Sequence, residues 1–418
     1  MKSMKMFARF GKSEYRRFLA AAVLLLVAVS AMLALCFISE ADGVAYAASD
    51  AQENIEEDLS DNVDGTIDRL DTDLFEKFLK SLDEDTLSAL GIDDLKAVLK
   101  SITKGGAHDF FGNFMSALGG VLGNYFLGFL PGFITIIVIC LLKNLLTGMT
   151  TELGGKSTNE VVHVVCYSAI IVILMTGAVK VIKTVTHTID ALSAFSEAVF
   201  PVLLTLLAAV GGASGVAVYQ PFMAVLSGSI IKLVQTIIVP AFIATIVFSV
   251  VGNISKNVKL DKLTKLFKSA AGWLIGIVFG LFATFLTAQG ITGGVIDRLS
   301  FNAAKFAMSS YVPILGGYLS DGFDLLSASM VLVKNAVGLT GVAVLLAVVL
   351  FPLLQLVVFM LGLRLTAAIA EPVGDARTSS VLGSLADNMS LLITALTGVG
   401  FMFFVLLMLI IGSCNLGV

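Results

Sequence analysis

Long apolar runs, most of them close to twenty residues, follow one another along most of the chain. Such a length matters because a helix needs about 20 mostly apolar residues to cross the hydrocarbon core of a bilayer. Seven runs are candidate spans, at residues 125–142, 161–179, 198–219, 222–251, 271–288, 337–361 and 391–411. The pattern predicts an all-α, polytopic helical membrane protein of about six to eight spans, some of them broken or re-entrant.

Composition and charge support this interpretation. Apolar residues make up 57% of the chain and its mean hydropathy is +0.95, whereas a soluble domain has about 45–50% apolar residues. Residues 101–418 carry only 12 acidic and 16 basic side chains. A soluble fold could not bury so much apolar surface, so we assign residues 107–418 to a multi-pass transmembrane domain.

The first 47 residues have the layout of a signal peptide. Six basic residues precede an apolar run at residues 18–38, and small residues lead to an expected cleavage site after Ala47. A lipoprotein signal ending at Cys36 is the alternative, although Leu35 stands where that signal needs a small residue. If the run stays as an uncleaved anchor, its basic flank remains cytoplasmic and the following segment still lies outside.

An acidic segment follows at residues 48–106, where residues 49–100 hold 16 acidic and five basic side chains. Leu70, Leu74 and Phe78 recur every four residues, with Phe75, Leu79 and Leu82 beside them, which predicts a helix with one apolar face. Ser81 and Glu84 fit a capping box, Gly91 fits a helix stop, and Asp93 can cap a further helix that runs to residue 102. We expect a small helical extracytoplasmic domain, with either a solvated charged face or a docking surface for a partner.

The lysines between residues 256 and 268 give conflicting information on topology. Five lysines recur there every three residues, with Asp261 as the one acid among them, which favours an interfacial helix on the cytoplasmic side. Four simple spans before this run would instead place it outside. We therefore expect a broken or re-entrant helix in residues 198–251, which contain Gly211, Gly212, Pro221 and Pro240.

Lys232 lies within the same stretch and is a candidate intramembrane charge. Ionisable residues at bilayer depth often mark a transport pathway. Snorkelling to the interface, or a pairing that holds helices together, is the alternative.

Residues 295–341 predict an amphipathic connector rather than a lipid-facing span, because charges and helix breakers interrupt the apolar run. Asp321 and Asp324 can share one helical face, with Lys305 or Lys334 as counter-charges, although ordinary structural pairing explains them equally well. In the polar stretch 364–388, Glu371 precedes Pro372 and is therefore not expected within a helix.

Several kinds of chemistry are not supported by the sequence. The glycine-rich run 211–215 lacks the lysine of a nucleotide-binding loop, and the three histidines are isolated from one another. The four cysteines show no framework spacing, so we expect free thiols. We predict no enzymatic activity, no cofactor, no metal and no nucleic-acid partner, and we identify no small-molecule substrate.

Four motifs in a fixed order carry a resemblance to a known family. They are Lys305-Phe306, the run 311–321 (Tyr-Val-Pro-Ile-Leu-Gly-Gly-Tyr-Leu-Ser-Asp), the run 334–338 (Lys-Asn-Ala-Val-Gly) and the run 371–377 (Glu-Pro-Val-Gly-Asp-Ala-Arg). With them, the sequence resembles the stage III sporulation protein AE family of spore-forming bacteria. The candidate partner or pore contacts are Lys305, Pro313, Gly316, Gly317, Asp321, Asp324, Lys334, Asn335, Glu371, Asp375 and Arg377.

The resemblance implies a multi-pass component of the mother-cell membrane that surrounds the forespore. It implies a channel or secretion-like complex with the other stage III sporulation A proteins, including a separate ATPase, and indirectly with stage II sporulation protein Q. Two other functions remain open: a stand-alone secondary transporter, for which matching inverted halves are not evident, and a structural membrane scaffold without a transport path.

Overall fold

Every element that this computed structural model describes is a helix. The description covers residues 51–153, 156–254, 260–311, 316–373 and 376–413, and within these ranges no strand is present. The predicted signal segment, residues 1–47, lies outside them, as do Cys36 and Cys414. Six of the described helical stretches are long and apolar enough to cross a membrane. The prediction of an all-α polytopic protein is therefore confirmed.

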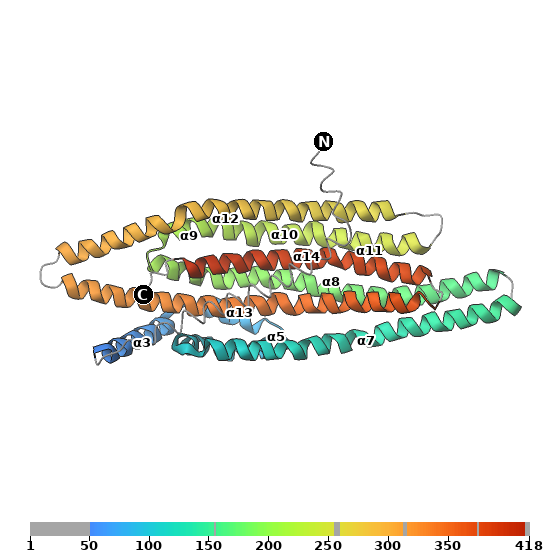
Figure 1. The fold of residues 1–418 in the computed structure, drawn as a ribbon, viewed down its shortest axis with the longest axis horizontal. Helices are drawn as coiled ribbons and strands as arrows, with labels where there is room; N and C mark the ends of the chain where they lie inside the picture. Colours follow the sequence, from blue (N-terminus) through green and yellow to red (C-terminus); the bar gives the residue numbers. More distant parts are fainter. Residues whose placement is uncertain (1–50, 154–155, 255–259, 312–315, 374–375, 414–418) are drawn as a thin grey trace, which may run out of the picture.

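Six long antiparallel stretches form a bundle (Figure 1). The third stretch contains two π-helical segments, η3 (Leu226–Ile230) and η4 (Val234–Ile238), on either side of the short α10 (Ile231–Leu233). The remaining elements are α7 (Ala107–Leu153), α8 (Lys156–Ala209), α9 (Ala213–Val225), α11 (Val239–Ile254), α12 (Asp261–Tyr311), α13 (Gly316–Ala370) and α14 (Ala376–Gly412).

The hairpin turn between α8 and α9 interrupts one of the seven candidate spans, and the six stretches found lie within the predicted range of six to eight. Gly211 has a φ of +88°, a conformation that glycine adopts without strain. A Cβ on Gly212 would lie 2.9 Å from the Leu207 carbonyl oxygen. The predicted span 198–219 therefore contains a helix end, a turn and a helix start. The break expected within residues 198–251 is confirmed at this turn, and from Ala213 to Ile254 the chain continues in one direction rather than re-entering.

The two prolines of this third stretch lie inside helical segments, not at a break. Pro240 is the second residue of α11, directly after η4. Proline removes the hydrogen bond to the residue four positions earlier, and a wider π turn is a common accommodation in a continuous helix. Lys232 lies between η3 and η4, and its side chain is exposed.

The connections that follow α7, α11 and α13 lie at the same end of the bundle. α7, α11 and α13 end at the right of Figure 1, where α8, α12 and α14 begin. We call this the lysine end, because Lys262 and Lys265 stand in the first two turns of α12 and are exposed. The α8–α9 turn, the end of α12, the start of α13 and Ser413 lie at the other end, which we call the distal end.

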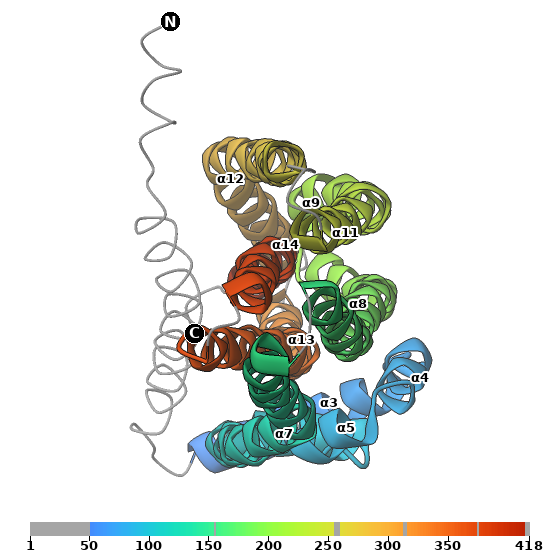
Figure 2. The ribbon, with the colours of Figure 1, turned by 90° about the vertical axis from the view of Figure 1, so that its right-hand side faces the viewer.

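Helix α14 occupies the centre of the bundle. Seen along the bundle in Figure 2, it lies among α8, α11, α12 and α13, and it contacts all four. In its most apolar stretch, 72% of the residues are buried. Glycines allow the closest approaches: a Cβ on Gly338 of α13 would lie 2.3 Å from Ile411, and one on Gly400 of α14 would lie 2.7 Å from Val349.

A region of four short helices and a π turn packs beside α7, α8 and α13 toward the distal end (Figures 1 and 2). The Phe78 ring meets Phe195 of α8 edge-on, with 5.8 Å between the ring centres. This region is therefore joined to the bundle by an apolar interface. Its elements are α3 (Ala51–Arg69), α4 (Asp73–Lys80), α5 (Glu84–Leu90), α6 (Leu95–Ser101) and η2 (Ile102–Gly106).

Several predicted details of this region are wrong. On the predicted apolar face of α4, Phe75, Phe78 and Leu79 are buried as expected, but Leu74 is 57% exposed. Ser81 ends α4 instead of starting a capping box, because its hydroxyl donates to the Phe78 carbonyl at 2.6 Å.

The predicted helix stop at Gly91 is confirmed, whereas the predicted cap at Asp93 is wrong by one residue. Gly91 ends α5 with a φ of +61°, as expected of a helix stop. The cap of α6 is Asp94, not Asp93. Its carboxylate accepts from the backbone amides of Lys96 and Ala97, at 2.9 and 3.3 Å.

Exposed apolar side chains gather in the half of the bundle nearest the lysine end. On α8 they run from Val161 to Val179, a length of about 28 Å at 1.5 Å per residue, close to the roughly 30 Å of a hydrocarbon core. We call this set the apolar belt; it comprises the exposed apolar residues within 126–149 of α7, 161–179 of α8, 237–251 of η4 and α11, 263–281 of α12 and 361–369 of α13.

Candidate functional site

The residues that the sequence singled out fall at two opposite ends of the molecule. Lys334 contacts the distal end of α14, whereas Arg377 stands at the lysine end of the same helix. The 37 residues of α14 span about 55 Å. The described candidates therefore do not form one site: Lys334 and Arg377 belong to two separate polar clusters, at opposite ends of α14.

Lys334 forms the distal cluster. Its side chain is completely buried, and its ammonium donates to the carbonyl of Ser413, directly after α14. The Ser413 hydroxyl donates to the Leu409 carbonyl at 2.6 Å and lies 2.8 Å from the Tyr219 hydroxyl of α9. A cation at a helix C-terminus satisfies free carbonyls and interacts favourably with the helix dipole. The cluster thus fastens α9, α13 and α14 together.

Lys334 is not a counter-charge of Asp324. The two residues are ten positions apart on one helix, or about 15 Å along its axis. Next to Lys334, Asn335 has a buried side-chain oxygen without a hydrogen bond. The structure does not describe the side chains of Lys305 and Asp321. Pro313 lies outside the described residues, and Gly316 and Gly317 are the first two residues of α13. α12 ends at Tyr311, so the predicted interruption falls between two long helices at the distal end.

Arg377 belongs to a cluster at the lysine end. A guanidinium nitrogen of Arg377, in the first turn of α14, lies 2.6 Å from Nε2 of His163 on α8. One turn farther along α8, Tyr167 donates to the Val250 carbonyl of α11 at 3.3 Å. These contacts join three helices. Glu371 follows the end of α13 and is exposed, as the proline after it indicated; Asp375 lies outside the described residues.

Asp387 is a further polar centre that sequence reasoning missed. Its carboxylate accepts from Arg364 of α13 at 3.1 Å, and its backbone carbonyl accepts from Lys268 of α12. The next residue, Asn388, is buried and donates to the Ser249 hydroxyl of α11 at 3.1 Å. Isolated polar residues on one apolar helix were the available signal, but the sequence did not indicate their partners.

The lysine run also differs from its prediction. Lys262, Lys265 and Lys268 do not belong to a separate interfacial helix. They stand on the first turns of the long helix α12. Lys262 and Lys265 are exposed, whereas Lys268 turns inward to Asp387. Lys256 and Lys259 lie outside the described residues.

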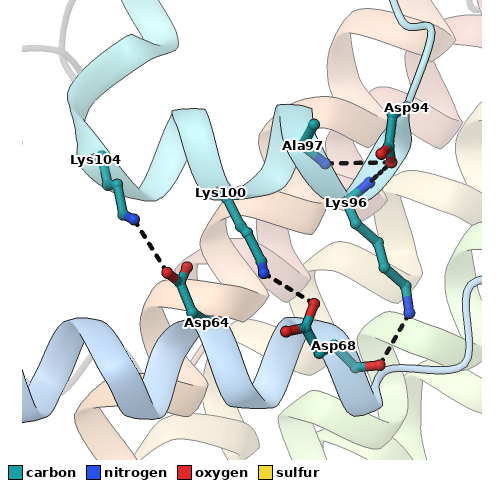
Figure 3. A network of polar contacts seen from close by, with 7 residues as sticks. All are labelled: Asp64, Asp68, Asp94, Lys96, Ala97, Lys100 and Lys104. Carbon is teal, nitrogen blue, oxygen red and sulfur yellow. Dashed lines mark hydrogen bonds and ion pairs between the residues drawn. The ribbon is translucent and has the colours of Figure 1, made fainter.

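A charged network holds the short-helix region together (Figure 3). Lys100 of α6 pairs with Asp68 of α3 at 2.9 Å, and Lys104 pairs with Asp64 at 3.1 Å. The hydrogen bond from Lys100 lowers the pKa of Asp68 below its ordinary value of 3.8, and the same bond raises the pKa of Lys100 above 10.5. Because both groups are exposed to water, the network positions α6 on α3 but contributes little stability.

Among the described residues, no group of three His, Cys, Asp or Glu side chains is arranged to hold a metal ion. Cys140 and Cys166 are not joined in a disulfide. The polar clusters connect helices to one another by hydrogen bonds and ion pairs. These contacts fix the relative positions of the six long helices. The outer surfaces of the helices stay available to lipid and partners.

Comparisons with known proteins assign the family. The sequence profile of stage III sporulation protein AE matches residues 93–414, which include the six-helix bundle. A relative of that name from Bacillus subtilis (strain 168) is 27% identical over 283 residues, covering 68% of this chain and 70% of the relative. No solved structure matches the chain. The chain belongs to the stage III sporulation protein AE family.

Proposed function

We propose that this protein is the membrane-embedded subunit of a channel or secretion-like complex between the mother cell and the forespore. The observation that carries the proposal is the family match over the bundle, which supports a role in sporulation. The complex would lie in the mother-cell membrane around the forespore. It would contain the other stage III sporulation A proteins and a separate ATPase, with stage II sporulation protein Q as an indirect partner.

The number of helices supports a definite orientation. Three long stretches, α7, α8 and α9–α11, precede the lysines of α12. An odd number of crossings places the short-helix region and these lysines on opposite sides of the membrane. Clustered lysines next to a span stay in the cytoplasm. The lysine end is therefore cytoplasmic, and residues 48–106 are extracytoplasmic.

The apolar belt supports a bundle that is only half embedded. Helix α13 has 55 residues and is about 82 Å long, more than twice the thickness of a hydrocarbon core. Outside the belt, α8 exposes Lys180, Lys183, Asp190 and Glu197, which are unfavourable in lipid. The distal half would thus project from the membrane with the short-helix region attached to it, where extracytoplasmic domains of partners can reach it.

The packed interior favours a subunit over a stand-alone transporter. α14 fills the centre of the bundle, and around it Phe200 stacks on Phe403 with 6.0 Å between ring centres. A passage would accordingly form between subunits rather than through one chain. The same packed interior is also compatible with a scaffold that has no passage. An experiment must therefore distinguish a channel subunit from a scaffold.

Flux through liposomes makes that distinction. We expect the purified chain alone to give no ion or solute flux, and the chain assembled with the other stage III sporulation A proteins to give flux. Flux from the chain alone would identify a secondary transporter. An assembled complex without flux would identify a scaffold. In the native spore-former, deletion of the gene should stop spore development, and normal sporulation of the deletion strain would contradict the proposal.

The α12–α13 connection at the distal end is the proposed contact with partners or a pore mouth. It joins the two helices around Gly316 and Gly317, at the end that projects farthest from the belt. Gly317→Val and Asp321→Asn should each stop spore development while protein level and membrane insertion stay normal. If both variants sporulate like the parent, the connection serves only packing.

A further inference from the structure

An apolar groove of about 300 Å³ opens between α7 and α8 within the apolar belt. Three aromatic rings line it: Phe129 and Phe133 from α7, and Phe359 from α13, whose centre lies 4.9 Å from that of Phe129. The groove extends along residues 128–136 of α7 and 173–180 of α8. These are the residues of the belt nearest the distal half. At 1.5 Å per residue they extend over about 12 Å, roughly the depth of one leaflet.

Glycines keep the groove open. A Cβ on Gly177 would lie 2.7 Å from the Phe359 ring, so this ring lies directly against the backbone of α8 and forms the floor. A Cβ on Gly128 would meet nothing within 4 Å, so the space above the floor is free at that point. The groove is therefore a concave apolar surface that faces the bilayer.

A second cavity of about 260 Å³ lies about one helical turn farther along α7, α8 and α13 toward the distal end, and we call it the polar cavity, although Val348, Phe351 and Pro352 also line it. It is lined by Tyr125 of α7, by Lys183, Thr184 and His187 of α8, and by Gln355 of α13, which accepts from Thr184 at 3.2 Å. Asp83 of the short-helix region is the acidic residue at its rim. An apolar groove thus leads into a polar cavity at the edge of the belt.

Lys180 stands between the two cavities. It is the residue after Val179, the last exposed apolar residue of the belt on α8, and its ammonium lies 5.1 Å from the centre of the Phe129 ring. Lys183 is three positions farther on and shares its helix face. Both side chains are exposed, and neither forms an ion pair within the described part of the chain. The two cavities together are lined by two lysines and one carboxylate, that of Asp83, and this balance of charge favours an anionic ligand.

We propose that the groove and the polar cavity together bind one anionic diacyl phospholipid from the leaflet nearest the distal end. An acyl chain lies in the groove over Phe359, and the phosphate is held by Lys180 and Lys183. The remaining headgroup occupies the cavity beside Tyr125, an aromatic residue of the kind that gathers at membrane interfaces. The lipid would seal the junction between the bundle and the short-helix region.

Lipid retention measured by native mass spectrometry tests this site. The full chain is purified in detergent and titrated with phosphatidylglycerol or phosphatidylcholine. We expect one retained phosphatidylglycerol and weaker retention of phosphatidylcholine. Gly128→Leu fills the groove and should lower the affinity for both lipids about tenfold or more, the effect of losing about 1.4 kcal/mol. The matched control Gly123→Leu adds the same side chain to open space elsewhere on α7 and should leave both affinities unchanged.

The double variant Lys180→Gln with Lys183→Gln tests the charges separately from the groove. It should lower the affinity for phosphatidylglycerol about tenfold, a loss of about 1.4 kcal/mol, and lower the affinity for phosphatidylcholine less, because the choline cation already offsets the charge of its phosphate. The proposal is overturned if Gly128→Leu, folded with the thermal midpoint of the parent, retains phosphatidylglycerol like the parent, if both lipids bind equally to the parent, or if a second copy of the chain occupies the groove. These outcomes are independent of flux and sporulation.

Discussion

Lys334 has more influence on the structure than its single charge suggests. It is a fully buried cation whose ammonium donates to the Ser413 carbonyl, next to the Tyr219 hydroxyl. Removing one partner of a buried polar contact leaves the other unsatisfied, which is more destabilising than the contact itself is stabilising. The residue was visible in the sequence as a charge in an apolar run, but its partner follows 79 positions later, and no local pattern indicates it.

Lys334→Ala should lower the free energy of unfolding by about 2–4 kcal/mol, because it removes the donor to α14 and leaves a cavity. Lys334→Met keeps the volume and should lower it by about 1–2 kcal/mol. Denaturant titration of the purified protein measures both.

Lys232→Ala is the matched control, because this lysine is exposed and should change the free energy by less than about 0.5 kcal/mol. Equal effects at the two positions would show that Lys334 does not stabilise the end of α14.

At the scale of the elements, the pairing of α13 with α14 depends on glycines at close approaches. A Cβ on Gly400 would lie 2.7 and 3.0 Å from the two methyl groups of Val349, whereas a Cβ on Gly383, also in α14, would meet nothing within 4 Å. Valine is held in few rotamers in a helix, so Val349 cannot easily move aside. The two glycines differ in their neighbours and not in their secondary structure.

Gly400→Ala should therefore destabilise the protein by about 1–3 kcal/mol through overpacking. Gly383→Ala should stabilise it by about 0.5–1 kcal/mol, because alanine is the better helix former. The difference in sign is the critical result, and it is measured by the denaturant midpoint of each variant. Stabilisation by both substitutions would mean that α13 and α14 are less tightly packed at Gly400.

The contact between α3 and α6 should be insensitive to pH over a wide range. Asp68 has a lowered pKa, so its contribution is present above 3.8 and is lost as the pH falls through its folded value; Lys100 has a raised pKa, so its contribution is present below 10.5 and is lost as the pH rises through its folded value. The distance between spin labels at Asp61 and Ser101 should stay constant from pH 5 to 9 and broaden only in stronger acid or base. Broadening between pH 5 and 7 would contradict the ion pair.

Periodicity predicted the helical elements but not their neighbours. The stop at Gly91 and the aromatic face of α4 could be predicted because helix signals are local. Leu74 was placed on the buried face because it continues the four-residue repeat, yet this position faces water. Which side of so short a helix is covered depends on α8, whose contacting residue Phe195 follows more than a hundred positions later. The Asp387 and Lys334 clusters escaped prediction for the same reason.

For the whole molecule, hydropathy alone does not distinguish helices that are buried in the bundle from helices that are exposed on its surface. The most apolar windows lie on α13 and α14, where 72% of the residues are buried inside the bundle, whereas the windows of α7, α8 and α12 are only about 20% buried. A run of residues can be apolar because other helices surround it or because lipid surrounds it. A hydropathy scale cannot distinguish these two cases. The seven predicted runs therefore identify the long helices, and the proposed position of the bilayer rests on the apolar belt.

Cysteine accessibility in intact protoplasts tests the central claim, the half-embedded bundle with a cytoplasmic lysine end, most directly. In a background with all four native cysteines replaced, single cysteines are placed at Lys262 and at Glu197, both exposed side chains. When the protein is expressed in vegetative cells, where its extracytoplasmic side faces the medium, an impermeant thiol reagent should label position 197 in intact protoplasts and position 262 only after the membrane is opened. Labelling of position 262 in intact protoplasts, or protection of position 197, would contradict the orientation and the projecting distal half.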